Sequence, residues 1–171
     1  PEVPIISGVA HDNTESLATV RRVPNEPGMA AKVFTLLAEA GVNVDMIVQA
    51  SASTGTADIS FTVPGSAAAK VREVLQEKQD ELGYQSFDID ANVGKVAVVG
   101  VGMKTHSGLA AKFFNALSDK GVNVLMISTS EIRIAALVPL EQLQDAVRAL
   151  HTAYGLDAEQ VEAVVYGGTG R

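Results

Sequence analysis

Residues 28–48 read GMAAKVFTLLAEAGVNVDMIV, and residues 108–128 repeat them as GLAAKFFNALSDKGVNVLMIS. Twelve of the 21 aligned residues are identical, and the alignment needs no gap. A repeat of this length indicates a supersecondary unit that is present twice. The 171-residue chain is therefore expected to form two related modules, each about half its length. Because a domain that small buries only about 60% of its unfolded surface, we expect the modules to pack together or against a second chain.

The composition excludes several classes of protein. A net charge of -7 and a pI near 4.9 give no basic surface for nucleic acid. The absence of cysteine excludes disulfides, thiolate metal sites and thiol nucleophiles. No apolar run approaches the roughly 18 residues that span a bilayer, and no signal peptide is visible, so we expect a cytoplasmic protein. Pro1 stands where an initiator Met is expected, which suggests a processed chain or a fragment.

The first module shows the element order βαββαβ. A helix is expected after the breaker segment PNEPG at residues 24–28, because apolar residues then recur on one helical face. Gly41 is placed to end that helix. Residues 42–48 alternate between apolar and polar, as in a half-buried strand. The other expected elements are strands at 17–23, 59–63 and 87–89 and a helix at 71–82.

The second module repeats that order. Its expected elements are strands at 95–101, from Val122, from Ile132 and at 163–166, and helices from Gly108 and at 143–154. Two crossovers of the same hand place both helices of a module on one face of a four-stranded antiparallel sheet.

The predicted fold class is therefore α+β, with two ferredoxin-like βαββαβ modules. We place the first module at residues 16–91 and the second at residues 92–171. Residues 1–15 are an N-terminal extension, and a possible extra strand at residues 5–9 could join either sheet.

The turn before the first helix, Val23 to Gly28, is the leading candidate for a binding site. Backbone N–H groups and the positive end of the helix dipole would converge there, which suits a carboxylate. Asn25 could instead be only the N-cap of the helix. Gly28 and Gly108 recur in both copies, which fits either a close approach to a ligand or helix-strand packing.

Other polar residues offer weaker candidates. Asn43 and Asn123 begin matching strands and could satisfy a turn or contact a ligand. Gln49 could be a ligand contact or a solvated edge residue. The histidines His11, His106 and His151 are dispersed, so we expect no metal site. Neither a dinucleotide fingerprint nor a phosphate-binding loop is complete, so we expect no cofactor.

An enzyme of the acylphosphatase type is an open alternative. In such a ferredoxin-like fold, Arg21 or Arg22 and Asn43 could bind a phosphoryl group. The second copy has Val99 and Gly100 at the arginine positions while it keeps an asparagine, so the asparagine does not depend on a nearby arginine.

The βαββαβ order, the Pro-Gly at the helix start and the run G-V-N-V-x-M-I resemble the ACT domain, a family that binds amino acids. The segments GKVAVVGVGM at 94–103, STSEIRI at 128–134 and VYGGTGR at 165–171 resemble the regulatory region of bacterial aspartate kinases. The resemblance covers nearly the whole chain. The nucleotide-binding half of those kinases is absent from it.

The resemblance implies a non-catalytic regulatory subunit or region of an ATP-dependent aspartate kinase. Its effectors are expected to be end-product amino acids, threonine and possibly lysine, bound between ACT modules for allosteric feedback inhibition. The expected partners are the catalytic (alpha) subunit of aspartate kinase and a second copy of the chain, in a homodimer through the ACT modules. A free-standing ACT amino-acid sensor with another partner is the other alternative.

The family's functional positions fall on particular residues of this sequence. The resemblance places effector contacts at Asn25, Gly28, Met29, Ala30 and Gln49 in the first module and at Asn123, Leu125, Met126 and Ile127 in the second. It places feedback-sensing positions at Ser51, Ser53 and Thr62. Close relatives commonly have Asp where this chain has Asn25, which removes a charge that could pair with an ammonium group. We expect effector sensing to favour the first module, and pairing and signal transfer to favour the second.

Overall fold

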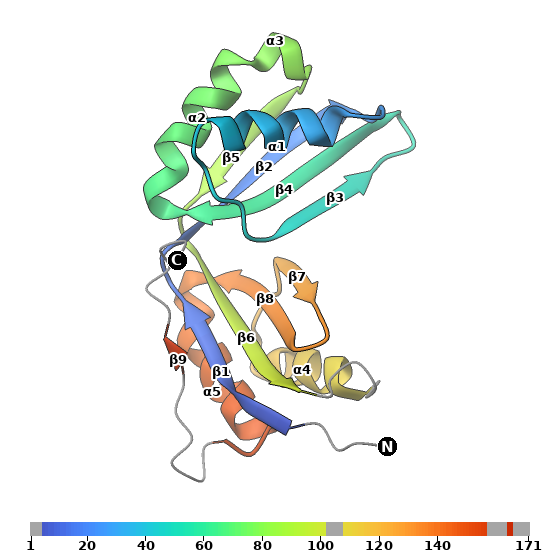
Figure 1. The fold of residues 1–171 in the computed structure, drawn as a ribbon. Helices are drawn as coiled ribbons and strands as arrows, with labels where there is room; N and C mark the ends of the chain where they lie inside the picture. Colours follow the sequence, from blue (N-terminus) through green and yellow to red (C-terminus); the bar gives the residue numbers. More distant parts are fainter. Residues whose placement is uncertain (1–4, 102–107, 157–163, 166–171) are drawn as a thin grey trace. The chain divides into compact units, whose positions relative to one another are not determined.

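The computed structural model describes residues 5–101, 108–156 and 164–165. They form two compact units, one made of residues 14–91 and the other of the described residues before 14 and after 91 (Figure 1). In each unit, helices pack against one face of a single sheet. The expected α+β fold with two ferredoxin-like modules is confirmed.

The elements of the unit at residues 14–91 are β2 (Glu15–Pro24), α1 (Met29–Glu39), β3 (Ile47–Ser51), β4 (Thr56–Pro64), the short 3-10 helix η1 (Gly65–Ala67), α2 (Ala68–Glu77), α3 (Gln79–Leu82) and β5 (Ser86–Asp90). Its four strands are antiparallel, in the order β3-β4-β2-β5. The core between sheet and helices includes Leu37, Phe61 and Leu75, which are fully buried. The ring of Phe34 packs edge-on against Phe61, with ring centroids 5.4 Å apart.

The elements of the other unit are β1 (Ile5–Asp12), β6 (Val93–Val101), α4 (Gly108–Asp119), β7 (Met126–Thr129), β8 (Arg133–Pro139), the short 3-10 helix η3 (Leu140–Gln142), α5 (Leu143–Ala153) and β9 (Val164–Val165). The sheet order is β7-β8-β6-β1-β9. Val96, Phe113 and Leu150 are fully buried between this sheet and its helices.

The N-terminal strand joins the sheet of this second unit. β1 pairs with β6 in an antiparallel arrangement. On its other side β1 pairs with β9, which is parallel to it and forms the edge of the sheet. This sheet therefore has five strands, one more than the sequence predicted, and one parallel pair. The side chain of Val9 enters the core, and β1 forms a longer ladder with β6 than the two residues of β9 could. Of the expected last strand at 163–166, only residues 164–165 are described.

The second strand of each module, β3 or β7, begins later than its alternating pattern predicted. Gly41 and Gly121 have positive φ angles of 80° and 69° and end the preceding helices, as expected. Val42 and Val122 then bury their side chains beneath those helices, and their N–H groups donate to helix carbonyls. The regular ladder with the neighbouring strand starts at Ile47 and Met126, although Asp45 and Leu125 already donate backbone hydrogen bonds to β4 and β8.

Close packing between β6 and α5 gives a first test of the structure. A Cβ atom added at Gly94 would lie 2.8 Å from Cδ2 and 3.2 Å from Cβ of Leu143, which is buried. We expect Gly94→Ala to lower the free energy of unfolding by about 1–3 kcal/mol, because an overpacked core must shift. Urea unfolding followed by circular dichroism measures the change.

Gly108→Ala is the matched control, because a Cβ atom there would meet nothing within 4 Å. That variant is expected to be at least as stable as the wild type, since Ala favours helix over Gly. Equal stability of the two variants would contradict the packing of α5 on β6.

Candidate functional site

Strand β2 contains one extra residue near its end. Val20 lies opposite Ile59 and Val23 lies opposite Ala57, so Arg21 and Arg22 together face the single residue Asp58. Two residues opposite one define a β-bulge, and bulges are frequent beside functional sites.

The bulge places Arg22 in a left-handed backbone conformation. Its φ is 56°, and it is the one non-glycine residue with a positive φ among the described residues. For residues with a Cβ atom this conformation costs about 1–2 kcal/mol. The Arg22 N–H donates to Oδ1 of Asp58 over 2.9 Å. That charge-assisted bond offsets part of the cost.

The bulge also determines on which face of the sheet the side chains at the end of β2 lie. Successive side chains of a strand alternate between the two faces of a sheet. With the extra residue, Val20 and Val23 both point into the core, where their side chains are 0% and 1% exposed. Asn25, two residues after Val23, is therefore on the helix side of the sheet.

Gln49 and Ser51 extend from β3 on that same side. They lie opposite Ile59 and Ala57, whose side chains are buried under the helices. Asn25 Nδ2 donates to Ser51 Oγ over 3.1 Å, and Gln49 Nε2 donates to Asn25 Oδ1 over 3.4 Å. We call Asn25, Gln49 and Ser51 the polar cluster. All three are exposed, so a ligand can reach them.

A backbone bond ties the turn of Asn25 to the loop between β3 and β4. The Asn25 N–H donates to the carbonyl of Gly55 over 3.0 Å, and the hydroxyls of Thr54 and Thr56 are 2.9 Å apart. Figure 1 shows the end of β2, the start of α1 and this loop at one end of the unit. The sequence analysis did not single out Gly55, Thr54 or Thr56.

Helix α1 begins beside the polar cluster without a side-chain cap. Its N-cap is Gly28, with φ 93°, so the alternative that Asn25 caps the helix is wrong. The first turn contains no acidic residue. A Cβ atom at Gly28 would meet nothing within 4 Å, so the space there is open. Met29 and Ala30 are half-buried and pack against the core.

The other two expected feedback-sensing positions of the first module are outside the hydrogen bonds of the polar cluster. Ser53 is exposed in the turn after β3. Thr62 is fully buried, and its Oγ1 accepts a hydrogen bond from the N–H of Met46 over 3.0 Å. Thr62 is five residues along β4 from the partner of Ser51, or about 17 Å. Thr62 therefore acts on the backbone before β3, away from Asn25.

The expected contacts of the second module form a different surface. The Asn123 N–H donates to Oε1 of Gln142 over 2.9 Å, and Nε2 of Gln142 donates to the carbonyl of Gly121 over 3.1 Å. Leu125 and Ile127 are 46% and 47% exposed, whereas Met126 is buried. Residues 102–107, which include His106, lie outside the described residues.

The arginines and the asparagine of the acylphosphatase alternative lie far apart. Asn43 follows the C-terminal end of α1, and Arg22 precedes its N-terminal end, so a helix about 16 Å long lies between them. Arg21 forms two hydrogen bonds with the Asp88 carboxylate, at 2.6 and 3.2 Å, and these lower the pKa of Asp88. The structure does not bring these residues together as a phosphate site.

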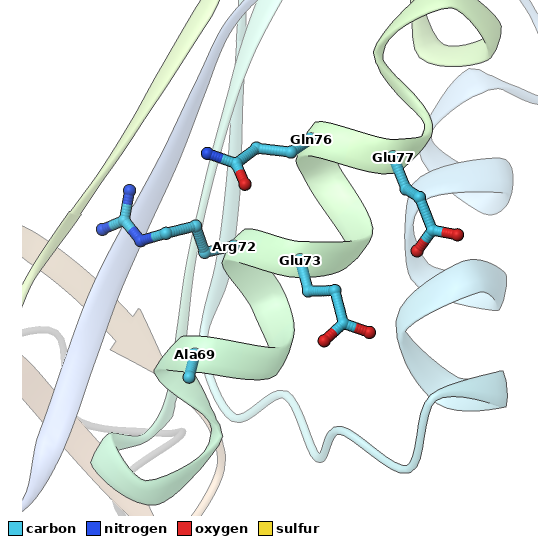
Figure 2. A pocket seen from close by; sticks show the side chains of 5 residues that line it. All are labelled: Ala69, Arg72, Glu73, Gln76 and Glu77. Atoms are coloured by element: carbon cyan, nitrogen blue, oxygen red, sulfur yellow. The ribbon is translucent and has the colours of Figure 1, made fainter.

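A pocket of about 540 Å³ lies on the outer surface of α2. All five of its lining residues belong to that helix: Ala69, Arg72, Glu73, Gln76 and Glu77. Figure 2 shows Arg72 and Gln76 extending to one side of α2 and the two glutamates to the other. Arg72 stacks over the ring of Phe87, 5.6 Å from its centroid. The pocket contains no residue of the polar cluster.

No helix in residues 5–101, 108–156 and 164–165 is long and apolar enough to cross a membrane. In the same part of the chain, no three His, Asp or Glu side chains are arranged to hold a metal ion.

Comparisons with known proteins point to one family. The ACT domain model matches twice, at residues 21–79 and 96–154. The aspartokinase of Corynebacterium glutamicum is 46% identical over 99% of this chain, which spans 41% of that relative's length.

Solved structures give the same result. A crystal structure of aspartokinase alpha and beta subunits contains a chain that is 42% identical, with a TM-score of 0.83 over 88% of this chain and 99% of the other. The ligand-free regulatory subunit of aspartate kinase from Thermus thermophilus is 37% identical, with the same coverage and TM-score.

The buried hydroxyl of Thr62 gives a second test. We expect Thr62→Val to lower the free energy of unfolding by about 1–3 kcal/mol, because it leaves the buried N–H of Met46 without an acceptor. Thr62→Ser keeps the hydroxyl and is expected to recover most of that loss. Urea unfolding of both variants measures the change in the free energy of unfolding. A Thr62→Val variant as stable as the wild type would contradict the structural role of this hydrogen bond.

Proposed function

This chain belongs to the ACT domain family, and we propose that it is the regulatory part of an aspartate kinase that binds an end-product amino acid. It matches the ACT domain model twice and spans 41% of the length of the Corynebacterium glutamicum aspartokinase. On this proposal it has no catalytic residue of its own. When the effector is bound, this chain inhibits a catalytic (alpha) subunit that phosphorylates aspartate. We place both in the cytoplasm.

The polar cluster beside the start of α1 carries the proposal. An amino acid has a carboxylate and an ammonium group on neighbouring atoms. The N–H groups and the positive dipole end of α1 suit the carboxylate. The amide oxygens of Asn25 and Gln49 and the hydroxyl of Ser51 are acceptors for the ammonium group. The open space at Gly28 lets the ligand approach the backbone.

Threonine fits this site better than lysine does. The polar cluster contains only neutral amide and hydroxyl groups, which can bond the side-chain hydroxyl of threonine. The second ammonium group of lysine would need a carboxylate partner, and the cluster has none. Threonine is therefore the proposed effector at the first module, with lysine as the alternative.

Effector binding must favour one arrangement of the protein to regulate a partner. A ligand that binds two states equally shifts neither. The polar cluster joins the start of α1 to the loop between β3 and β4, through the bond of Asn25 to Gly55 and through Ser51. A bound amino acid would tighten that connection, and the change at β3 would reach a module that pairs with this strand.

Pairing of two chains through their ACT modules is part of the proposal. β3 and β7 are edge strands of their sheets. Exposed apolar side chains lie on or next to both edges, namely Ile47, Val48, Leu125 and Ile127. Edge strands with apolar side chains favour pairing with another chain.

Calorimetric titration with threonine and with lysine tests the site. We expect Asn25→Ala to weaken threonine binding about tenfold, since it removes an acceptor and both bonds of the cluster. Asn25→Asp is expected to strengthen binding, because a carboxylate makes a charge-assisted bond to the ammonium group. Asn43→Ala is the matched control, because Asn43 is exposed beyond the C-terminal end of α1, and this variant is expected to bind threonine as the wild type does. No heat and no thermal shift with millimolar threonine or lysine would contradict the proposed function.

Substitution on β3 tests dimerisation. Ile47 is 52% exposed on the edge strand, and Ile47→Asp is expected to raise the dimer dissociation constant at least tenfold, because the interface would bury an unpaired charge. Ile132→Asp is the matched control, since Ile132 is 56% exposed and lies outside the strands. Sedimentation velocity measures both. A monomeric wild type, or a dimer that Ile47→Asp leaves intact, would contradict pairing through β3.

A further inference from the structure

The bulge of β2 is held by a residue outside the polar cluster, and we propose that Asp58 is a positioning residue for effector binding. Its carboxylate holds the left-handed backbone of Arg22 and thereby keeps Asn25 on the side of Gln49 and Ser51. This inference rests on the proposed function, since it concerns affinity at the same site.

The first step follows from the alternation of side chains along a strand. If β2 were regular after Val20, the residue after Arg22 would move to the other face of the sheet, because a shift by one residue exchanges the faces. Val23 would leave the core, and Asn25 would face away from β3. The extra residue is therefore a condition for the bonds of Asn25 to Ser51 and Gln49.

The second step concerns what stabilises the extra residue. Arg22 has a backbone conformation that residues with a Cβ atom rarely adopt. Its N–H has no place in the regular ladder, and it donates to Oδ1 of Asp58 over 2.9 Å. The neighbouring Arg21 pairs with Asp88 of β5 instead. Asp58 is thus the residue that compensates the strain at Arg22.

The second module gives an internal comparison. There β6 pairs with β8 without a register shift, and the Gly100 N–H donates to the Ile132 carbonyl in the ordinary way. The position of Asp58 corresponds to Arg133, because the Val-Pro pairs at 63–64 and 138–139 align. An arginine side chain cannot accept a hydrogen bond. The acceptor and the bulge therefore occur together in the first module, whereas the described pair β6 and β8 has neither at the matching positions.

Substitution of Asp58 in the whole chain tests the proposal. Asp58→Ala is expected to weaken threonine binding about tenfold in calorimetry, whereas Asp58→Asn, which keeps an acceptor oxygen, is expected to stay within about threefold of the wild type. Asp88→Ala removes the neighbouring carboxylate and is the matched control, with affinity unchanged. Wild-type affinity in Asp58→Ala, or an equal loss in Asp88→Ala, would overturn the proposal.

A second pair of variants decides the question if Asp58→Ala does not fold. Arg22→Gly accepts the positive φ and is expected to raise the melting temperature by a few degrees while threonine binding is kept or improved. Arg22→Val has a β-branched side chain that disfavours this φ and is expected to bind at least tenfold more weakly. Equal binding by the two variants would overturn the role of the bulge.

Hydrogen exchange separates this inference from the proposed function. If the wild type takes up neither threonine nor lysine, the proposed function fails, and the amide of Asn25 still reports on its bond to Gly55. Asp58→Ala is expected to speed exchange at Asn25 at least tenfold relative to Asp58→Asn. Unchanged exchange would show that Asp58 does not hold the turn.

Discussion

The alternation of side chains along β2 is the constraint on which the site depends. In a regular strand, the side chains of Val20 and Val23 would lie on opposite faces of the sheet. Both are buried in the same core, which requires one extra residue between them. The hydrogen bond from Arg22 to Asp58 makes that addition possible. The same extra residue therefore determines that Val23 enters the core and that Asn25 lies on the side of Gln49 and Ser51.

The two copies of the repeat have the same helix ends and core packing, but their surfaces differ. The glycines that end the first helix, Gly41 and Gly121, and the buried valines that follow have the same geometry in both modules. The bulge and the polar cluster belong to the first module. The second module has an exposed apolar edge at Leu125 and Ile127 instead. Duplication has kept the core and separated the two surfaces.

Much of this could be predicted from the sequence. The repeat gave the fold, and the Pro-Gly turn gave the location of the candidate site, since both depend on local residue patterns. The bulge was not predicted: the spacing of Val20 and Val23 breaks the alternation of the strand, but Arg21 and Arg22 were interpreted as phosphate ligands instead. The sequence left Asn25 open between a helix cap and a ligand contact; the structure gives the N-cap to Gly28, and the ligand contact stays a prediction. The hydrogen bond from the N–H of Met46 to the Thr62 hydroxyl, just before β3, also left no sign in the local pattern.

The position of β1 has a consequence for the order of folding. β1 pairs with β6, and the whole unit of residues 14–91 lies between them in the chain. During synthesis that unit is complete before β6 exists, so it can fold while β1 has no partner in its sheet. Long-range pairing of this kind is slow. The unit at residues 14–91, which carries the polar cluster, is therefore expected to fold first. The other unit is completed last, when β1 pairs with β6.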